Sequence, residues 1–275
     1  GFGYYPAGMG QHLVGLAAQH GRAALALKKW EPDPAFKFGE PLGKCRSSDS
    51  KVLGGGGSGG VIGGGWAARF LLNGWDVRVF DPDPDAEAKL APVLAQARRA
   101  LPSLTDVALP PEGRLSFHND LANVVRNVDW VQESVPERLE IKHKVLAKVQ
   151  AACPENAIIG SSTSGFKPSE LQRDAQRPGQ IMVCHPFNPV YLMPLVEVVH
   201  TASTPASILA RAVSFARQLD KLPLPCRSAP GFLVNRVLAP YMLEAVHAAT
   251  DGVPLDVIDQ AAMDFGMPVG PVELS

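Results

Sequence analysis

The sequence lacks the features that would place it in a membrane, at a metal centre or among disulfide-rich proteins. No apolar run reaches the ~18 residues that a membrane-spanning helix needs, and no basic-then-apolar signal segment opens the chain. Its four cysteines show neither a CxxC pair nor metal-ligand spacing, so we expect reduced thiols, a cytoplasmic location and no metal. The net charge of −1 offers no field that would gather nucleic acid or an anionic membrane.

The length and composition fit a globular protein with a buried core. The chain has 275 residues, which is enough for two domains, and 46% of them are hydrophobic while 19% are charged. The first residue is glycine rather than methionine, so we expect a processed, tagged or partial product. Residues 1–50 remain unassigned as an appendage or linker, because Gln11–Trp30 has helical spacing but nothing there suggests chemistry.

From residue 51 onward, short apolar runs alternate with amphipathic stretches. The predicted strands are Asp76–Phe80, Asp129–Gln132, Ala157–Gly160, Ile181–Cys184 and Leu195–Val199. The predicted helices between them lie near Ala67–Gly74, Asp85–Leu101, Pro136–Cys153 and Ala206–Leu219. This alternation predicts an α/β fold with a Rossmann-type, mainly parallel sheet over residues 51–222. After Pro223 and Pro225 the pattern becomes all-helical, with helices near 235–250 and 255–265, so we expect a shortened helical domain over residues 223–275.

A glycine-rich segment and a downstream acid have the layout of a dinucleotide site. The segment opens a helix, and the strand that follows ends in Asp81, 18 residues after Gly63. In such a fold, glycines let the backbone approach the pyrophosphate, the helix N-terminus faces its charge, and the acid binds the adenine ribose. Asp81 and Asp83 would repel the 2′-phosphate of NADP, so NAD is the expected cofactor. The expected contacts come from Ser58, Gly60, Val61, Ile62, Gly63 and Asp81.

The glycine fingerprint is altered, and this leaves a second interpretation open. Ser58 occupies the first position of G-x-G-x-x-G when Gly60 and Gly63 fill the other two. The preceding strand keeps only Val52 and Leu53 before a run of glycines, and glycine weakens a strand. The alternative is a flexible linker without a cofactor role. The cofactor interpretation is favoured because the helix, the second strand and the acid all follow in register.

Four polar residues stand at the ends of predicted strands or helices, namely Ser164, His185, Glu197 and Asn235. Alcohol oxidation needs a base for the hydroxyl proton, and histidine is suited to this because it titrates near neutral pH. A buried acid such as Glu197 needs a partner, and a histidine would provide one. Ser164 and Asn235 could donate to the negative charge that develops on oxygen. Taken singly, each residue is more easily explained as a structural histidine, a turn serine or a helix cap.

Taken together, the same residues resemble a known family. From Val61 to about Ser275 the chain looks like the 3-hydroxyacyl-CoA dehydrogenase superfamily, whose active-site serine, histidine, glutamate and asparagine fall on Ser164, His185, Glu197 and Asn235. The intervals of 21, 12 and 38 residues match the family without gaps. The resemblance implies that His185 is the general base, that Glu197 orients it, and that Ser164 and Asn235 hydrogen-bond the reacting oxygen.

Within that family the resemblance divides along the chain. Residues 61–199 resemble L-carnitine dehydrogenases, for example in the string Glu133–Glu137, and the resemblance places Glu133 near the nicotinamide end of the cofactor site. Residues 206–275 resemble the dehydrogenase part of multifunctional fatty-acid oxidation proteins, for example in Ser228–Arg236. A 3-hydroxyacyl-CoA is therefore the first expected substrate, and L-carnitine is the second.

The expected partners also follow from the resemblance. The helical domain of the family supplies dimer contacts and closes over the substrate, so we expect a small-molecule substrate and a homodimer through residues 223–275. The quaternary ammonium of carnitine would need aromatic faces, and Tyr191 and Trp66 are candidates. A hypothesis of another class stays open, in which the chain is a non-catalytic NAD- or acyl-CoA-binding remnant or fusion.

Overall fold

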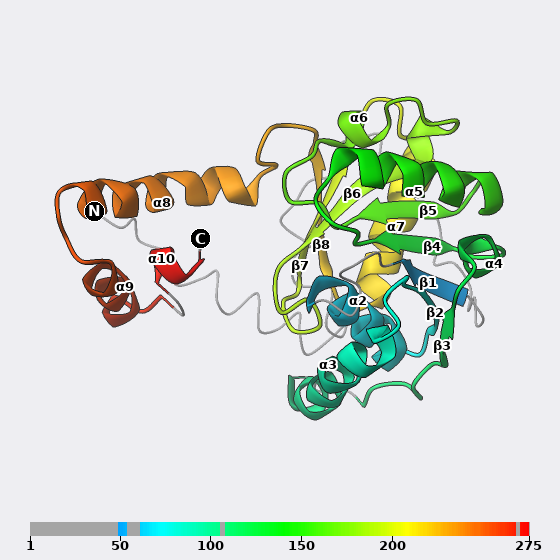
Figure 1. The fold of residues 1–275 in the computed structure, drawn as a ribbon, viewed down its shortest axis with the longest axis horizontal. Helices are drawn as coiled ribbons and strands as arrows, with labels where there is room; N and C mark the ends of the chain where they lie inside the picture. Colours follow the sequence, from blue (N-terminus) through cyan, green and yellow to red (C-terminus); the bar gives the residue numbers. More distant parts are fainter. Residues whose placement is uncertain (1–48, 54–60, 105–107, 268–269, 275) are drawn as a thin grey trace, which may run out of the picture.

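The computed structural model describes residues 49–53, 61–104, 108–267 and 270–274, and a single sheet forms its centre (Figure 1). The described strands are β1 (Asp49–Leu53), β2 (Asp76–Phe80), β3 (Leu115–His118), β4 (Trp130–Glu133), β5 (Ile158–Ser161), β6 (Ile181–Pro186), β7 (Leu195–His200) and β8 (Leu222–Arg227). Their order is β3-β2-β1-β4-β5-β6-β7-β8, and only β6 and β7 pair antiparallel. The predicted α/β fold with a mainly parallel, Rossmann-type sheet is confirmed.

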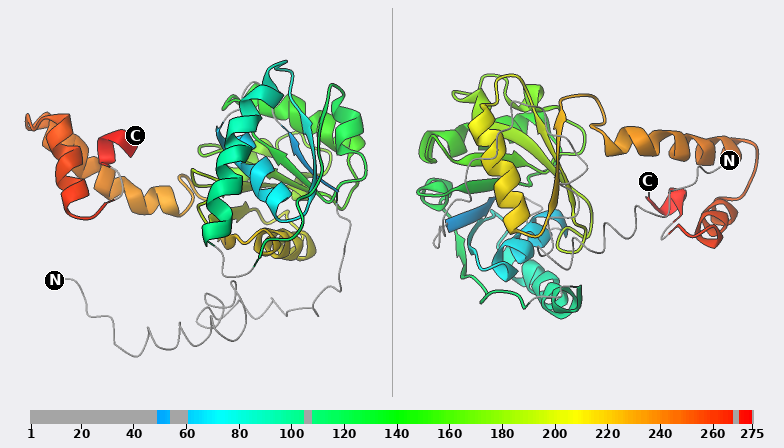
Figure 2. Two further views of the ribbon diagram at one scale, coloured as in Figure 1. Left: turned by 90° about the horizontal axis from the view of Figure 1, so that it is seen from below. Right: turned by 180° about the vertical axis from the view of Figure 1, so that it is seen from behind.

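Helices cover both faces of this sheet, as the view of Figure 1 and the view from behind in Figure 2 show. One face carries α2 (Val61–Leu72), α3 (Ala86–Ala100) and α7 (Ala206–Gln218). The other face carries α4 (Leu121–Val125), α5 (Leu139–Ala152) and α6 (Pro168–Leu171). A 3-10 turn, η1 (Leu101–Leu104), follows α3, and a second one, η2 (Pro178–Gln180), precedes β6. The predicted alternation of strands and helices therefore builds a three-layer domain.

Each face of the sheet packs a separate apolar core, because successive side chains of a strand point to opposite faces. On β4, Trp130 joins the core beneath α2 and α7, whereas Val131 joins the core beneath α5. Ile158 and Ile159 on β5 divide between the two cores in the same way. Strands that are buried on both faces require continuous apolar runs, which explains why these runs were recognisable in the sequence.

The helical unit after the sheet consists of α8 (Val234–Thr250), α9 (Leu255–Asp264) and α10 (Pro271–Leu274), and it extends away from the sheet (Figure 2). No side chain of α8 or α9 is buried, and exposed apolar residues include Leu243, Val246 and Val257. Asp259 ties α10 to α9, because its carboxylate accepts the backbone N–H of Val272 at 2.7 Å. The all-helical prediction for this part of the chain is confirmed.

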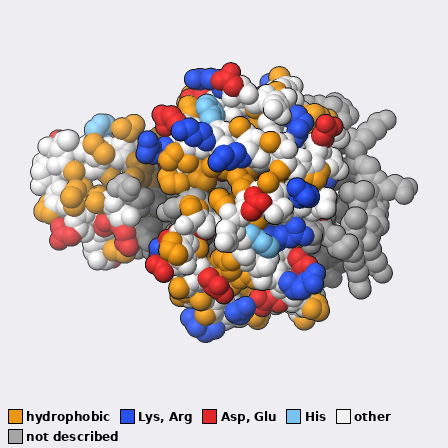
Figure 3. Space-filling model, turned by 45° about the vertical axis from the view of Figure 1, so that its right-hand side comes forward, with side chains coloured by type: hydrophobic (Ala, Val, Ile, Leu, Met, Phe, Trp, Pro, Cys, Tyr) orange, Lys and Arg blue, Asp and Glu red, His pale blue; other side chains and the backbone are white. Residues whose placement is uncertain are grey.

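The surface and the cysteines of the described residues agree with the composition. On the face drawn in Figure 3, positive and negative side chains are interspersed with apolar ones. None of the described helices is long and apolar enough to cross a bilayer.

Cys153, Cys184 and Cys226 are free, and burial is the main cause that raises the pKa of each thiol. These three thiols are therefore poor nucleophiles.

Two edge strands were not predicted from the sequence. Strand β8 contains Pro223 and Pro225, which we interpreted as the start of the helical domain. Proline cannot donate to a sheet ladder, but an edge strand tolerates it, and among the described strands β8 pairs only with β7. The sheet therefore continues to Arg227, and the expected domain start at residue 223 falls inside β8. At the opposite edge, β3 is short and only half-buried, so it has no strong apolar pattern.

The docking of α2 provides a test of the packing. A Cβ added at Gly65 would lie 2.7 Å from Cβ of Val190, in the loop that joins β6 to β7. We therefore expect Gly65→Ala to lower the free energy of unfolding by about 1–3 kcal/mol, as overpacking does. Urea denaturation measures this loss. Gly64→Ala is the matched control, because its nearest neighbour is the flexible tip of Leu90 at 3.2 Å. Equal losses in both variants would contradict the close docking of α2 on this loop.

Candidate active site

A buried histidine and a buried glutamate face each other across the antiparallel strands β6 and β7. The register of this pair places His185 opposite Glu197. His185 Nδ1 lies 2.7 Å from Glu197 Oε2, and the two residues are 7% and 0% exposed. With its proton on Nδ1, the imidazole donates to the carboxylate and keeps Nε2 available for chemistry. The sheet thus brings together the histidine and the glutamate that the sequence analysis paired.

The second carboxylate oxygen of Glu197 binds the beginning of α8. Oε1 accepts the backbone N–H groups of Leu233 at 2.8 Å and Val234 at 2.9 Å. The first N–H groups of a helix have no partners within the helix, and its N-terminus carries partial positive charge. Burial would raise the pKa of Glu197, but the hydrogen bonds from His185, Val234 and Leu233 outweigh it and lower that pKa. Glu197 is therefore ionised at neutral pH.

Ser164 and Asn235 meet at the junction between the sheet and α8. Asn235 lies in the first turn of α8, and its Nδ2 donates to the backbone carbonyl of Ser164 at 3.5 Å. Ser164 is exposed in the loop after β5, where Glu137 accepts hydrogen bonds from Thr163 Oγ1 and from the N–H of Gly165. Contacts through α8 therefore link all four predicted catalytic residues.

Two phenylalanines contact the imidazole, and the sequence analysis did not single out either of them. The ring of Phe187 lies 4.9 Å from that of His185 between centroids, and the ring of Phe232 lies 5.5 Å away. Phe187 is two residues from His185, and Phe232 is three residues from Asn235. Their presence inside the motifs of the catalytic residues was the only available signal, because apolar residues in a motif are usually assigned to the core.

The described part of the predicted cofactor site has the expected arrangement. Gly63 is buried in the first turn of α2, where no acidic side chain competes for the helix N-terminus, and Ile62 is half-buried beside it. Half-buried Asp81 directly follows β2. The strand order reverses at β1, between β2 and β4, which is where such sheets bind dinucleotides. Ser58, Gly60 and the side chain of Val61 lie outside the described residues. The residues that are described fit an NAD site.

Glu133 ends β4 in a fully buried polar cluster. Its carboxylate accepts from the N–H of Val135 at 2.7 Å and from Lys142 Nζ at 2.9 Å, and Ser161 Oγ donates to its other oxygen. Lys142 also pairs with Glu137 at 3.2 Å, and the side chain of Glu137 is 44% exposed. The Glu133 side chain therefore faces protein groups, and its predicted role at the nicotinamide remains a prediction. Lys142 and Glu137 were not predicted, although Glu137 belongs to a quoted motif.

The two aromatic residues considered for a quaternary ammonium lie in the core. Trp66 is fully buried on α2 and packs against Phe70, while Nζ of Lys221 lies 5.6 Å from the centroid of its ring. Tyr191 is 5% exposed, and its backbone carbonyl accepts from Arg69. Neither ring presents a face to a substrate. Among the described residues, Phe187 is the half-buried aromatic ring that contacts His185.

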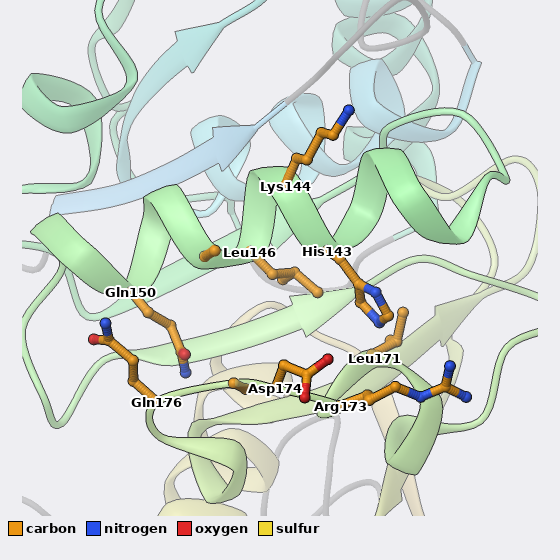
Figure 4. A pocket seen from close by; sticks show the side chains of 10 residues that line it. His143, Lys144, Leu146, Gln150, Leu171, Arg173, Asp174 and Gln176 are labelled. Carbon is orange, nitrogen blue, oxygen red and sulfur yellow. The ribbon is translucent and has the colours of Figure 1, made fainter.

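A separate groove lies beside α5, outside the set of predicted site residues (Figure 4). Its volume is about 320 Å³, and its polar lining includes His143, Arg173 and Asp174. His143 Nε2 is already bound to the backbone carbonyl of Glu170 at 2.7 Å. Lys144 points away from the groove (Figure 4). His143 and Lys144 therefore do not join Arg173 and Asp174 in a convergent set of polar groups of the kind that defines a ligand site.

Two family descriptions match this chain, one over the sheet and one over the helical unit that follows it. Residues 52–229 match the family described as 3-hydroxyacyl-CoA dehydrogenase, NAD binding domain. Residues 231–275 match 3-hydroxyacyl-CoA dehydrogenase, C-terminal domain. The two matches meet just after β8, where the chain leaves the sheet.

Among curated proteins, the chain is 57% identical over 212 residues to the L-carnitine dehydrogenase/betainyl-CoA thioesterase of Ruegeria pomeroyi, covering 76% of this chain and 44% of that protein. It is 45% identical over 197 residues to the L-carnitine dehydrogenase of Mesorhizobium japonicum, covering 71% of this chain and 54% of that protein. The chain thus spans about half the length of these curated relatives.

Solved structures of similar fold include two named for acyl-CoA substrates. The 3-hydroxybutyryl-CoA dehydrogenase of Escherichia coli K12 has a TM-score of 0.70 and 28% identity, covering 83% of this chain and 49% of that one. The (S)-3-hydroxybutyryl-CoA dehydrogenase of Ralstonia eutropha has a TM-score of 0.70 and 27% identity, covering 82% and 81%. These structures have the same fold as this chain.

The link between Glu197 and α8 predicts an effect of pH on stability. Because the folded-state pKa of Glu197 is below the ordinary 4.5, its stabilising contribution is present above 4.5 and is lost as pH falls through the folded-state pKa. Glu197→Gln should lower the free energy of unfolding by about 1.5–3 kcal/mol at neutral pH and flatten its decline in acid. Chemical denaturation across pH measures both effects. Exposed Glu155 provides the control Glu155→Gln, and similar pH profiles for both variants would contradict this role of Glu197.

Proposed function

Because the chain belongs to the 3-hydroxyacyl-CoA dehydrogenase family, we propose that it transfers a hydride between NAD and the 3-hydroxy carbon of a small substrate. The observation that carries this proposal is the 2.7 Å contact between His185 Nδ1 and one carboxylate oxygen of Glu197. The other oxygen of Glu197 binds the beginning of α8, the helix that bears Asn235. A merely structural histidine would not require a buried, ionised acid behind it.

His185 acts as the general base in the direction of oxidation. Its Nε2 takes the proton as the O–H bond breaks, and the carbon–oxygen bond becomes a ketone while the hydrogen on that carbon leaves with its electron pair. Glu197 Oε2 accepts the hydrogen bond from His185 Nδ1, which lies 2.7 Å away, and the carboxylate stabilises the imidazolium that forms. Ser164 Oγ and Asn235 Nδ2 donate to the reacting oxygen. In reduction, the protonated histidine returns the proton.

The cofactor site orients the hydride acceptor relative to this pair. NAD, when bound, supplies the nicotinamide that accepts the hydride. The N-terminus of α2 would hold its pyrophosphate, and Asp81 would accept hydrogen bonds from the adenine ribose. Because α2 docks through Gly65 on the loop that joins β6 to β7, the cofactor helix and the base share one rigid support.

We favour L-carnitine as the substrate, with a 3-hydroxyacyl-CoA as the second candidate. The order is the reverse of the one expected from the sequence, because relatives of 45–57% identity are named L-carnitine dehydrogenases. The half-buried ring of Phe187 beside His185 offers an aromatic surface that a quaternary ammonium can use. The acyl-CoA alternative is supported by the two solved structures of 27–28% identity.

The substrate is tested by following NADH absorbance after dehydrocarnitine or acetoacetyl-CoA is added to the purified protein. We expect NADH to be consumed with dehydrocarnitine, and more slowly or not at all with acetoacetyl-CoA. The opposite preference would establish the acyl-CoA alternative. If folded protein binds NADH but consumes it with neither compound, the non-catalytic alternative holds and the proposed reaction is wrong.

The role of His185 is tested by substitution. His185→Ala should reduce kcat by about 10²–10⁴-fold, because it removes the general base, while the Kd for NAD changes little. Steady-state kinetics and calorimetric titration with NAD measure the two quantities. His200→Ala, at the C-terminal end of the neighbouring strand β7, is the matched control and should leave both nearly unchanged. Full turnover in His185→Ala would refute the assignment.

A further inference from the structure

Phe232 has a backbone conformation that is rare for its residue type. Its φ is +50°, and that of the preceding Gly231 is +70°, so two successive residues are left-handed. Glycine adopts this conformation freely, but a bulky residue does so at a cost and keeps it only when the surroundings hold it there. Such an outlier inside a candidate active site requires a physical reason.

The side chain of Phe232 connects the core to the catalytic histidine. It is 2% exposed and belongs to the apolar core on the α5 face of the sheet. Its ring lies 5.5 Å from the imidazole of His185, with 58° between the planes, while Phe187, the residue after β6, contacts the same imidazole. Such tilted contacts are the preferred geometry of aromatic pairs. The imidazole therefore contacts two rings that come from different parts of the chain.

The left-handed turn lets one short segment reach three partners. Phe232 contacts His185, the N–H groups of Leu233 and Val234 bind Glu197, and Asn235 reaches the carbonyl of Ser164. Right-handed backbone at residue 232 would redirect the N–H groups that follow relative to the Phe232 ring. The strained residue thus stands where the ring contact and the contact with Glu197 have to be made together.

We propose that Phe232 is a positioning residue for His185. The hydrogen bond from Nδ1 to Glu197 fixes one point of the imidazole, but the ring can still tilt about that bond. Contact with Phe232 restricts this tilt and so directs Nε2 toward the substrate hydroxyl. The proposal rests on the proposed function, because the direction of Nε2 matters only if His185 is the base. The alternative is that Phe232 merely fills the core.

Phe232→Leu separates these two roles. Leucine keeps an apolar side chain on the same left-handed backbone and removes only the flat ring. We expect kcat to fall by about 10- to 100-fold, as a small misplacement of a catalytic group can produce, while KM and the Kd for NAD change less than about twofold. The matched control is Phe166→Leu, because Phe166 packs against the same core but has no ring contact with His185 among the described residues.

A second measurement does not depend on turnover. The Nδ1–H proton of His185 should give a downfield NMR resonance, identified by its absence in His185→Ala. In Phe232→Leu it should broaden, because a less restricted imidazole exchanges this proton faster, whereas a change of shift alone would follow from the loss of any neighbouring ring. In Phe166→Leu it should remain as in the wild type. This result would support the positioning role even if the substrate assays showed no activity. Failure of the proposed function can therefore be distinguished from failure of the positioning role.

The proposal is overturned if Phe232→Leu keeps both kcat and the Nδ1–H resonance while losing as much stability as Phe166→Leu. Phe232 would then be a core residue only. If Phe232→Leu does not fold, Phe232→Met supplies a flexible apolar replacement for the same measurements. A wild-type resonance and kcat in that variant would equally overturn the proposal.

Discussion

The buried carboxylate of Glu197 is the constraint on which the candidate active site depends. A charge at 0% exposure is stable only when its oxygens are fully hydrogen-bonded, and Glu197 meets this requirement from two directions. One oxygen binds His185, which lies in the same sheet, and the other binds the first N–H groups of α8. One ionised group therefore orients His185 and holds the helix that carries Asn235.

The position of Asn235 in the candidate active site depends on contacts at the junction between the sheet and α8. No side chain of α8 or α9 is buried in the described part of the chain, so apolar packing of these helices does not fix where Asn235 lies. The contacts of residues 232–235 with His185, Glu197 and Ser164 perform that task.

The sequence-based predictions were more accurate for features that depend on residues close together in the chain than for features that depend on contacts between distant segments. The central strands and long helices were predicted because their apolar periods reflect local geometry. Strand β8 was not predicted, because a strand with Pro223 and Pro225 is possible only at a sheet edge, and the sequence does not show which strand is the edge. Ser164, His185, Glu197 and Asn235 were identified as a set by their resemblance to a known family, whereas Phe232 resembles any core residue until its φ and its contact with His185 are known.

The order of strands and helices could be read from the amino-acid sequence, because it reflects patterns among residues near one another in the chain. The four polar residues were recognised through their resemblance to a known family. Tertiary structure decided which of these residues meet. The antiparallel register of β6 and β7 placed His185 opposite Glu197, and the burial of Glu133, Trp66 and Tyr191 turned them toward the protein interior. Such contacts depend on how strands pair and how helices dock, and no local pattern determines this.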